Sequence, residues 1–398
     1  MSEFEAKSMC ILGRQPALGL SELESLYGAE HIRPIAGAAL LDIDAVDINF
    51  KRLGGTIKVA RLLSVLPTTK WSQLLDYLKK TIPQHLQHVS EGPFTLGLSL
   101  YGLSVPINEI NKGTLTIKRA VKPTGRNIRV VPNKNAELNA AQVLHNKLTH
   151  KGAWELLLIR DGSQTYLAQT LFVQDIEAYA ARDQARPKRD ARIGMLPPKL
   201  GQIIINLAVG HIKSQDSSRV RILDPFCGTG VVLQEALLMG YSVLGTDSNE
   251  RLIEYSKTNI RWLVQKYPNL SGHVSIEIGD ATDFKWPRFS AVASEVYLGR
   301  PLNNLPDQAE LKKIINDVNT ITKKFLLNLA PQLKKGQKVS LAVPAWKTKT
   351  GFKYLPLIDH LTDMGYNRVQ FQHVRREDLI YFREDQIVAR ELLVLEKN

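Results

Sequence analysis

Apolar and polar residues in the first half of the chain alternate between short strand-like runs and longer stretches with helical spacing. Leu18, Leu23 and Leu26 form one face of a helix that ends before Gly28. Further helices are predicted at 71–86 and 138–148. Strands are predicted at 9–12, 39–43, 57–63, 94–100, 127–131, 154–159 and 166–170. The pattern predicts an α+β region made of two subdomains, residues 1–66 and 67–175.

The second half repeats a strand-then-helix pattern. Helices are predicted at 231–238, 251–265 and 307–329, and strands at 220–223, 242–245, 274–278, 291–296 and 338–343. Residues 368–374 and 387–395 are typical of a terminal antiparallel pair. Such alternation favours the α/β class, with a doubly wound sheet covered by helices on both faces. We expect this domain at 195–398, after a charged, exposed linker at 176–194.

Length and composition narrow the class of protein. A chain of 398 residues suits two or three domains, and 44% apolar with 23% charged residues is typical of a globular protein. No apolar run is long enough for a membrane span, and the first ten residues lack the apolar core of a secretory signal. Two cysteines give neither a disulfide framework nor a cysteine-rich zinc site. We expect a soluble, cytoplasmic protein without a metal.

Positive charge is concentrated before the α/β half. The formal net charge is +13, and residues 51–151 hold 16 Lys and Arg against 4 Asp and Glu. This distribution favours a nucleic-acid contact over a merely solvated surface. The basic candidates for that contact are Lys112, Lys118, Arg119, Lys122, Arg126 and Arg129.

The sharpest chemical motif is DPFCGTG at 224–230, between a predicted strand and a predicted helix. Its glycines allow a ligand to approach the backbone closely, beside free N–H groups of the helix. Asp247 ends the next strand, where an acid holds a ribose in this fold. Leu233 stands where a dinucleotide motif needs its third glycine. A cofactor with a carboxylate, an amine and a ribose therefore fits better than a dinucleotide.

These motifs, with Gly279-Asp280-Ala281, resemble those of S-adenosylmethionine-dependent amino-methyltransferases. MLPPKL at 195–200 is similar to the start of the catalytic domain in THUMP-domain tRNA (guanine-N2)-methyltransferases of the guanosine-10 type. Residues 53–63 and 118–131 are similar to that family's N-terminal and THUMP modules. The resemblance covers nearly the whole chain and implies a Rossmann-like methyltransferase domain behind a ferredoxin-like and THUMP region.

The resemblance also implies roles for individual residues. It places the methionine end of S-adenosylmethionine beside Asp224, the ribose beside Asp247 and the adenine amine beside Asp280. The remaining implied cofactor contacts are Pro225, Phe226, Gly228, Gly230, Ala281 and Lys199. Lys199 fits a solvated position at the start of a helix equally well. The implied partner is tRNA. Whether a small activator protein subunit also binds is left open by the sequence.

The fourth motif departs from the family pattern. The family carries (D/N)PPY, whose polar oxygens accept the N–H bonds of the target amine and whose aromatic ring stacks on the base. This chain has SEVYLG at 294–299. Either Tyr297 is the family tyrosine and Ser294 replaces the acid, or Glu295 is the acid. We predict methylation of a guanine N2 in tRNA by Glu295, Tyr297 and Ser294. The alternatives are a catalytically inactive tRNA-binding protein and a DNA amino-methyltransferase.

Overall fold

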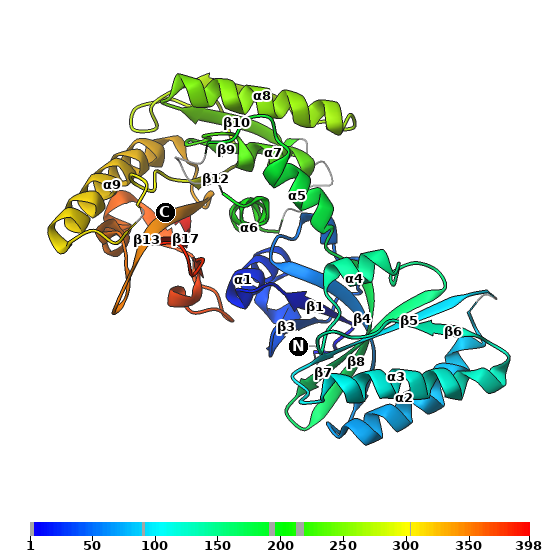
Figure 1. Ribbon diagram of the computed structural model, residues 1–398. Helices are drawn as coiled ribbons and strands as arrows, with labels where there is room; N and C mark the ends of the chain where they lie inside the picture. The colour runs from blue at the N-terminus through cyan, green and yellow to red at the C-terminus, as the bar shows by residue number, and fades with distance from the viewer. Residues whose placement is uncertain (1–3, 90–91, 191–195, 212–218, 303) are drawn as a thin grey trace. The chain divides into compact units, whose positions relative to one another are not determined.

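The chain folds into two compact units (Figure 1). The computed structural model describes residues 4–89, 92–190, 196–211, 219–302 and 304–398. Unit 1 comprises Met1–Pro16, Glu30–Lys51 and Thr56–Glu177, and unit 2 comprises Ala17–Ala29, Arg52–Gly55 and Ala178–Asn398. This division differs from the predicted segments, because two stretches from the first 55 residues belong to unit 2. None of the described helices is long and apolar enough to cross a membrane.

Unit 1 is built on one continuous eight-stranded sheet with the order β2-β3-β1-β4-β8-β7-β5-β6. Its strands are β1 (Ser8–Leu12), β2 (Ile32–Ile35), β3 (Ala38–Leu41), β4 (Thr56–Leu66), β5 (Phe94–Tyr101), β6 (Ile128–Val130), β7 (Ala153–Asp161) and β8 (Gln164–Val173). The sequence predicts separate subdomains at 1–66 and 67–175, but β4 and β8 pair along their length across that boundary. Pairing between distant strands leaves no local signal in the sequence.

Two helices of unit 1, α2 (Trp71–Leu86) and α3 (Ile107–Val121), pack together on one face of the sheet (Figure 1). They bury leucines and isoleucines of both helices against β5, β7 and β8. Gly113 of α3 permits the close approach, since a Cβ there would lie 2.5 Å from Cζ2 of Trp71. A short helix, α4 (Ala140–His145), begins at Asn139, whose side chain accepts a hydrogen bond from the backbone N–H of Gln142.

A buried ion pair joins the middle strands of this sheet. Nζ of Lys58 on β4 lies 2.5 Å from Oε1 of Glu155 on β7, and the side chains are 1% and 0% exposed. Lys58 also donates to the carbonyl of Leu138 at 2.7 Å. The Glu155 carboxylate accepts further hydrogen bonds from Ser99 and Thr170 at 2.6 and 2.7 Å. Both charged groups are therefore hydrogen-bonded inside unit 1.

Unit 2 contains a nine-stranded sheet whose main order is β11-β10-β9-β12-β13-β17-β15. Its first five strands run parallel, and β17 lies antiparallel between β13 and β15. The strands are β9 (Arg221–Asp224), β10 (Ser242–Asp247), β11 (Val274–Ile278), β12 (Ala291–Glu295), β13 (Lys338–Thr348), β14 (Gly351–Lys353), β15 (Tyr366–Arg368), β16 (Ile380–Tyr381) and β17 (Val388–Lys397). The terminal antiparallel pair is thus present, although its first strand ends at Arg368 instead of residue 374.

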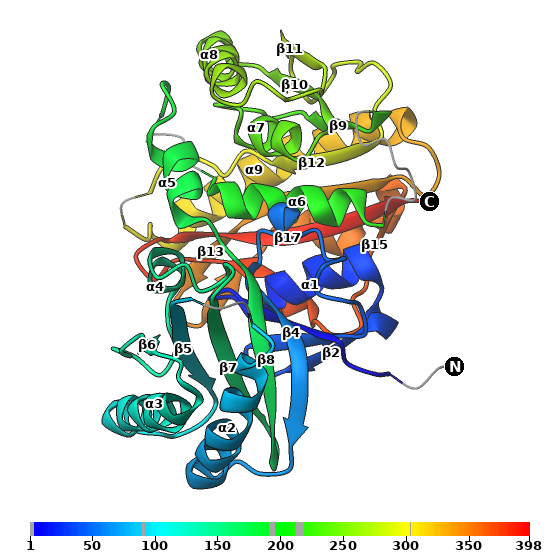
Figure 2. The same cartoon turned by 90° about the vertical axis from the view of Figure 1, so that its right-hand side faces the viewer.

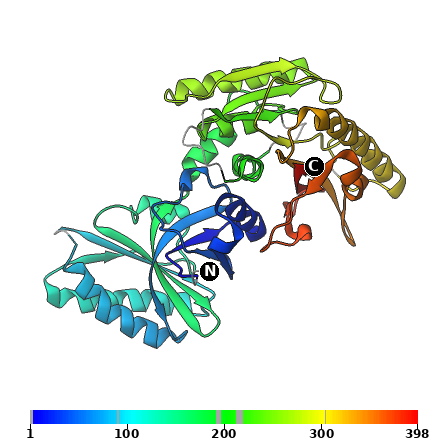
Figure 3. The same cartoon turned by 180° about the vertical axis from the view of Figure 1, so that it is seen from behind.

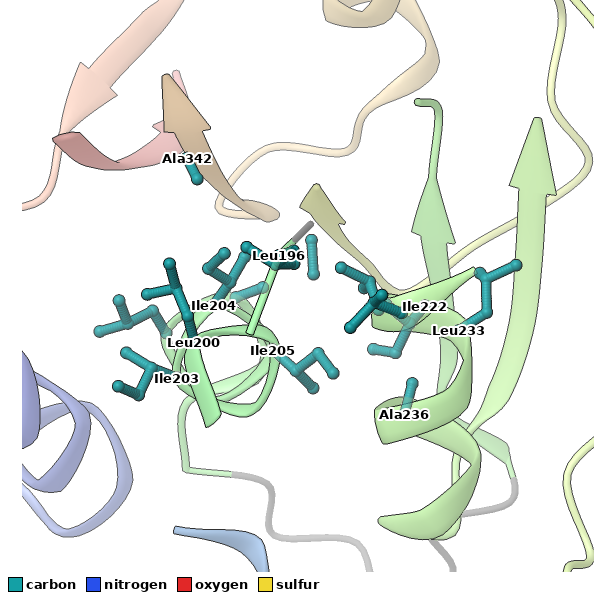
Figure 4. Close-up of a cluster of buried hydrophobic side chains, with 14 of the residues drawn as sticks. Leu196, Leu200, Ile203, Ile204, Ile205, Ile222, Leu233, Ala236 and Ala342 are labelled. Carbon is teal, nitrogen blue, oxygen red and sulfur yellow. The ribbon is translucent and has the colours of Figure 1, made fainter. Parts of the chain in front are cut away.

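Helices cover both faces of this sheet, as Figures 1 and 3 show. α6 (Pro198–Val209), α7 (Val231–Leu238) and α8 (Glu250–Lys266) pack on one face, and α9 (Gln308–Leu329) on the other. Figure 2 shows α6 lying alongside β13 and β17, and Figure 4 shows Leu200 and the isoleucines of α6 facing Ile222 and α7. The doubly wound arrangement predicted for the second half is therefore present.

A helix from the beginning of the chain, α1 (Pro16–Tyr27), completes unit 2. Its Glu22 is fully buried and accepts hydrogen bonds from the backbone N–H groups of Gly54 and Gly55 at 2.9 and 2.8 Å. It also accepts one from the Asn206 amide of α6 at 2.6 Å. A Cβ on Gly55 would lie 2.4 Å from Cα of Gly19, so the backbones touch at this point. Residues from three separate stretches of chain thus meet around one carboxylate.

The predicted linker is also different in the structure. Residues 176–194 include the helix α5 (Ile176–Gln184), and residues 191–195 lie outside the described part of the chain. Arg182 of α5 is 9% exposed and pairs with Glu235 of α7 at 2.7 Å. Asp190 is 8% exposed and pairs with Arg251 of α8 at 2.8 Å. The sequence predicts an exposed, charged segment here because the partners of these charges, Glu235 and Arg251, lie far along the chain.

Candidate active site

The DPFCGTG segment forms the turn between β9 and α7. Gly228 and Gly230 have φ of +51° and +83°, a region that side chains other than glycine rarely adopt. A Cβ on Gly230 would lie 2.4 Å from Oγ of Ser256. Both glycines are therefore required by the turn, and α7 begins directly after Gly230. The turn leaves the helix N-terminus open at the carboxyl end of the sheet.

A cavity of about 500 Å³ lies at the carboxyl ends of β9, β10 and β12. It brings together most of the predicted site residues, which end or follow different strands: Asp224, Pro225, Phe226, Gly228, Asp247, Asp280, Ala281, Glu295 and Tyr297. Ser248 and Asn249 also line it and were missed by the sequence reasoning, although they directly follow Asp247. The predicted residues Gly230, Ser294 and Lys199 do not line this cavity.

Asp224 is the most buried carboxylate of the cavity, with 2% exposure. Its Oδ1 accepts hydrogen bonds from the Ser294 hydroxyl at 2.6 Å and from the backbone N–H of Phe226 at 3.3 Å. Burial raises the pKa of Asp224 to about 7, and the nearby Asp247 and Glu295 add to this increase. A cationic group entering the cavity would stabilise the charged form of this carboxylate.

Ser294 is displaced from its predicted role by this contact. It is fully buried on β12, and its hydroxyl donates to Asp224 instead of facing the cavity. Ser294 therefore orients the carboxylate of Asp224. A short polar residue at a strand end looks the same in sequence whether it serves a ligand or a neighbouring strand.

Two further acids stand at the strand ends. Asp247 Oδ2 accepts from the backbone N–H of Gly228 at 3.0 Å, and Oδ1 accepts from that of Asn249 at 2.9 Å. Partial burial raises the pKa of Asp247. Asp280 accepts from the N–H and the hydroxyl of Thr282 at 2.9 and 2.8 Å. Local backbone bonds therefore hold both carboxylates in place at the cavity wall.

Glu295 and Tyr297 occupy the position of the divergent fourth motif. Oε1 of Glu295 accepts a hydrogen bond from Nε of Arg390 at 2.5 Å, and Arg390 is 5% exposed on β17. Burial raises the pKa of Glu295, whereas Arg390 acts in the opposite direction. Tyr297 follows with 42% exposure, so its ring is open to a ligand. Arg390 was missed because it lies almost a hundred residues away in the chain.

Lys199 is not where the resemblance implies. Its ammonium lies 5.1 Å from the centre of the Tyr179 ring, and burial lowers its pKa. It lies at the start of α6 and does not reach the cavity wall. The start of a helix fixes only the backbone, and a lysine side chain has several directions available.

The predicted nucleic-acid contacts lie in unit 1, and five of the six are exposed: Lys112, Lys118, Arg119, Lys122 and Arg129. Three of these are on α3, a helix that the sequence reasoning did not identify within its basic segment. Arg126 differs from the rest. Its guanidinium donates to the carbonyls of Leu86 and Val89 at 2.5 and 2.9 Å and lies over the Phe94 ring. Arg126 thus stabilises the C-terminal end of α2 by hydrogen bonds to its last carbonyl and to the segment that follows.

Solved structures with a similar fold cover nearly the whole chain. TrmN from Thermus thermophilus has a TM-score of 0.53 and 16% identity, covering 99% of this chain and 100% of its own. A possible methylase from Clostridium difficile 630 has a TM-score of 0.50 and 11% identity, covering 98% of both. At such identities the likeness concerns the fold. It confirms the class predicted for the second half, a Rossmann-like methyltransferase fold, whereas the ferredoxin-like and THUMP character of the first half stays a prediction.

Sequence relatives match shorter stretches. The tRNA (guanine(10)-N2)-dimethyltransferase of Methanothermobacter thermautotrophicus is 42% identical over 81 residues, 20% of this chain and 22% of that protein. The protein of the same name from Pyrococcus abyssi is 34% identical over 122 residues, 30% and 33% of the two chains. Residues 206–276 match the family of D12 class N6 adenine-specific DNA methyltransferases. The predicted resemblance to tRNA (guanine-N2)-methyltransferases is confirmed, over less than two thirds of those relatives' length.

Proposed function

We propose that this protein transfers a methyl group from S-adenosylmethionine to the exocyclic N2 of a guanine in tRNA. The observation that carries the proposal is the cavity itself. It collects three acids in different settings, Asp224, Asp247 and Glu295, with an exposed tyrosine at the carboxyl edge of a Rossmann-like sheet. Ligands bind at this edge in doubly wound folds. A tRNA substrate also implies a cytoplasmic protein.

The residues of the cavity fit S-adenosylmethionine. The buried carboxylate of Asp224 suits an ammonium group, and Asp247 suits the hydroxyls of a ribose. Asp280 and Ala281 offer a polar and an apolar contact on the wall after β11. When bound, the cofactor supplies an electrophilic methyl group. The chain's own residues then need only to hold and orient the acceptor.

Glu295 and Tyr297 would hold that acceptor. A carboxylate that accepts N–H bonds from an aromatic amine raises the electron density on its nitrogen, and a stacked ring fixes the plane of the base. No strong base is needed at the start, since the nitrogen loses its proton only as the new C–N bond forms. Glu295 is the group at the cavity wall best placed to take up that proton.

Methyl transfer to unmodified tRNA tests the proposal. We expect label from S-adenosylmethionine to appear on a guanine. Replacing Tyr297 by alanine should lower kcat/KM by about tenfold or more, because base stacking on an aromatic ring contributes about 1–3 kcal/mol. Tyr297→Phe keeps the ring and should retain most of the activity. A complete tRNA pool that accepts no label from the wild-type protein would contradict the proposal.

The second candidate is a tRNA-binding protein without catalysis. It is favoured by the absence of both motif prolines from residues 294–299. Tight, salt-sensitive tRNA binding without any methylated product would support it. The DNA amino-methyltransferase alternative gains support from the family match at 206–276. Label on duplex DNA in place of tRNA would favour that alternative.

The exposed basic residues of α3 give a second test of the tRNA proposal. Reversing the charge of Lys118 and Arg119 together should weaken tRNA binding, with the slope of log K against log salt reduced by about 2. Lys323 and Lys324 provide a matched control, because they are also an exposed adjacent pair on a helix, α9 of unit 2. Electrophoretic mobility or fluorescence titration across a salt series measures both. An equal loss in the two double variants would contradict a specific contact at α3.

A further inference from the structure

The strand β13 continues past the edge of the unit 2 sheet at which the cavity lies. Glu295, the last residue of β12, is level with Ala342 of β13. From there β13 continues to Thr348, about 20 Å further along the strand, and the chain turns back into β14. The hairpin that residues 346–353 form therefore extends from the same edge of the sheet as the cavity.

This β13–β14 hairpin has a defined shape. Its two strands pair antiparallel, with Thr348 opposite Gly351. The Thr348 hydroxyl donates to the carbonyl of Gly351 at 2.7 Å and closes the turn. The backbone N–H of Lys347 donates to the carbonyl of Ile387 at 2.8 Å, so the segment that leads into β17 supports the hairpin from the side. The side chains of the hairpin therefore project from a fixed ribbon.

The hairpin is strongly basic. Its exposed lysines are Lys347, Lys349 and Lys353. The sequence contains no Asp or Glu from residue 318 to residue 358. The loop before β17 contributes two acids nearby, of which Asp385 lies close to Arg383. Among the residues that the structure describes, none of the hairpin lysines forms an ion pair, so their charges are available to an anionic partner.

Two aromatic rings lie beside these lysines. The centres of the Phe352 and Phe382 rings are 5.8 Å apart, and the ammonium of Lys347 lies 6.0 Å from the centre of the Phe382 ring. Both rings pack on a small apolar cluster around Ile380 and are half-buried, which leaves part of each ring exposed. Partly exposed rings beside lysines fit single-stranded nucleic acid, because rings stack on unpaired bases and ammonium groups contact phosphates.

We propose that the β13–β14 hairpin binds the single-stranded RNA that flanks the nucleotide in the cavity, through phosphate contacts of its lysines and stacking on its aromatic rings. This rests on the proposed function and adds to it a binding surface on unit 2. A base leaves the helical stack to reach such a cavity, so the strand beside it is unpaired and accessible. The hairpin offers that strand a cationic ribbon at the edge of the sheet where the base is held.

Binding of a short RNA tests the hairpin without requiring methyl transfer. A fluorescent single-stranded RNA of about ten nucleotides, within the span of one single-strand site, is titrated with the full chain across a salt series. Lys349→Glu with Lys353→Glu should weaken binding about tenfold or more at about 50 mM salt. The slope of log K against log salt should fall by about 1.4, because each phosphate contact of a single strand contributes about 0.7. Lys349→Arg with Lys353→Arg keeps both charges and should retain the affinity.

The same strand provides the matched control. Lys334 and Lys335 are also exposed and adjacent, but they precede β13 at its opposite end, away from the cavity. Lys334→Glu with Lys335→Glu makes the same change in net charge and should leave the affinity for the RNA nearly unchanged. Thermal unfolding identifies any variant that fails to fold, and replacement of the same lysines by glutamine then serves instead.

Wild-type affinity in the hairpin double variant, or an equal loss in the control, would overturn the proposal. A blunt RNA duplex of the same length should respond less to the hairpin variant, and an equal response would overturn the assignment to a single strand. Failure of the proposed function has a different appearance: the short RNA binds through the hairpin, yet tRNA accepts no methyl group. Methylated tRNA together with an unaffected hairpin variant would contradict this inference alone.

Discussion

Replacing Lys58 by methionine is expected to lower the unfolding free energy of unit 1 by about 3–5 kcal/mol, because the change leaves the buried charge of Glu155 without its partner. Lys58 is 1% exposed, and Glu155 is fully buried. The carbonyl of Leu138 would lose its donor as well. Urea denaturation measures the loss of unfolding free energy, and hydrogen exchange of the backbone amides in β5, β7 and β8 shows whether it arises in unit 1.

The double variant Lys58→Met with Glu155→Gln is the control for this prediction. It removes both charges and keeps an amide that can bond to the hydroxyls of Ser99 and Thr170. Replacing a buried ion pair by neutral groups is often close to neutral in stability. We therefore expect the double variant to recover at least half of the loss. A single variant that costs less than about 1 kcal/mol would mean that water reaches this pair.

Replacing Asp224 by asparagine is expected to weaken binding of S-adenosylhomocysteine by about 10- to 100-fold, because a bond to a charged acceptor contributes about 1.5–3 kcal/mol. The variant keeps an oxygen that can accept the hydrogen bond from the Ser294 hydroxyl. The substitution therefore removes the negative charge and leaves the fold intact. Isothermal titration calorimetry measures the affinity. Asp283→Asn makes the same chemical change at an exposed position outside the cavity and should have no effect.

The same carboxylate predicts a pH dependence. The pKa of Asp224 is about 7 in the free protein, so its carboxyl group is protonated below that pH and charged above it. Only the charged form attracts an ammonium group. The affinity of the wild-type protein should therefore fall by about tenfold between pH 8 and pH 6. Asp224→Asn should remove this dependence, and an unchanged pH profile would assign the ammonium group to another acceptor.

The sequence was sufficient for elements whose signal is local. Residues 71–86 form α2 and residues 231–238 form α7, both as predicted from apolar spacing. The helix α3 was missed although Ile110, Ile117 and Val121 are buried at helical spacing. Its Gly113 is unfavourable in an isolated helix and is explained only by the approach of Trp71. That approach depends on another helix and cannot be read from α3 alone.

The same distinction holds for the site. Asp224 and Asp247 end a strand, Asp280 follows a glycine, and all three line the cavity, whereas their roles toward the cofactor stay a prediction. Arg390 could not be found, because its meeting with Glu295 depends on the order of β12, β13 and β17 in the sheet. Ser294 and Glu295 are neighbours, and the sequence alone fits either of them to the acidic position of the fourth motif. Only the structure separates the one that bonds to Asp224 from the one that lines the cavity.

The path of the chain through the two units has a consequence for how the protein is made. Residues 17–29 leave the ribosome early, but Asn206 and the sheet of unit 2 are synthesised only after unit 1 is complete. The bond from Asn206 to Glu22 can therefore form only after unit 1 has been synthesised, whereas those from Gly54 and Gly55 can form earlier. For the same reason, a gene cut at residue 178 would not yield an intact second unit, since it would leave Asn206 without Glu22 and the core without Leu18. The two units are distinct folded bodies, but unit 2 is complete only when two stretches from the first 55 residues of the chain are present.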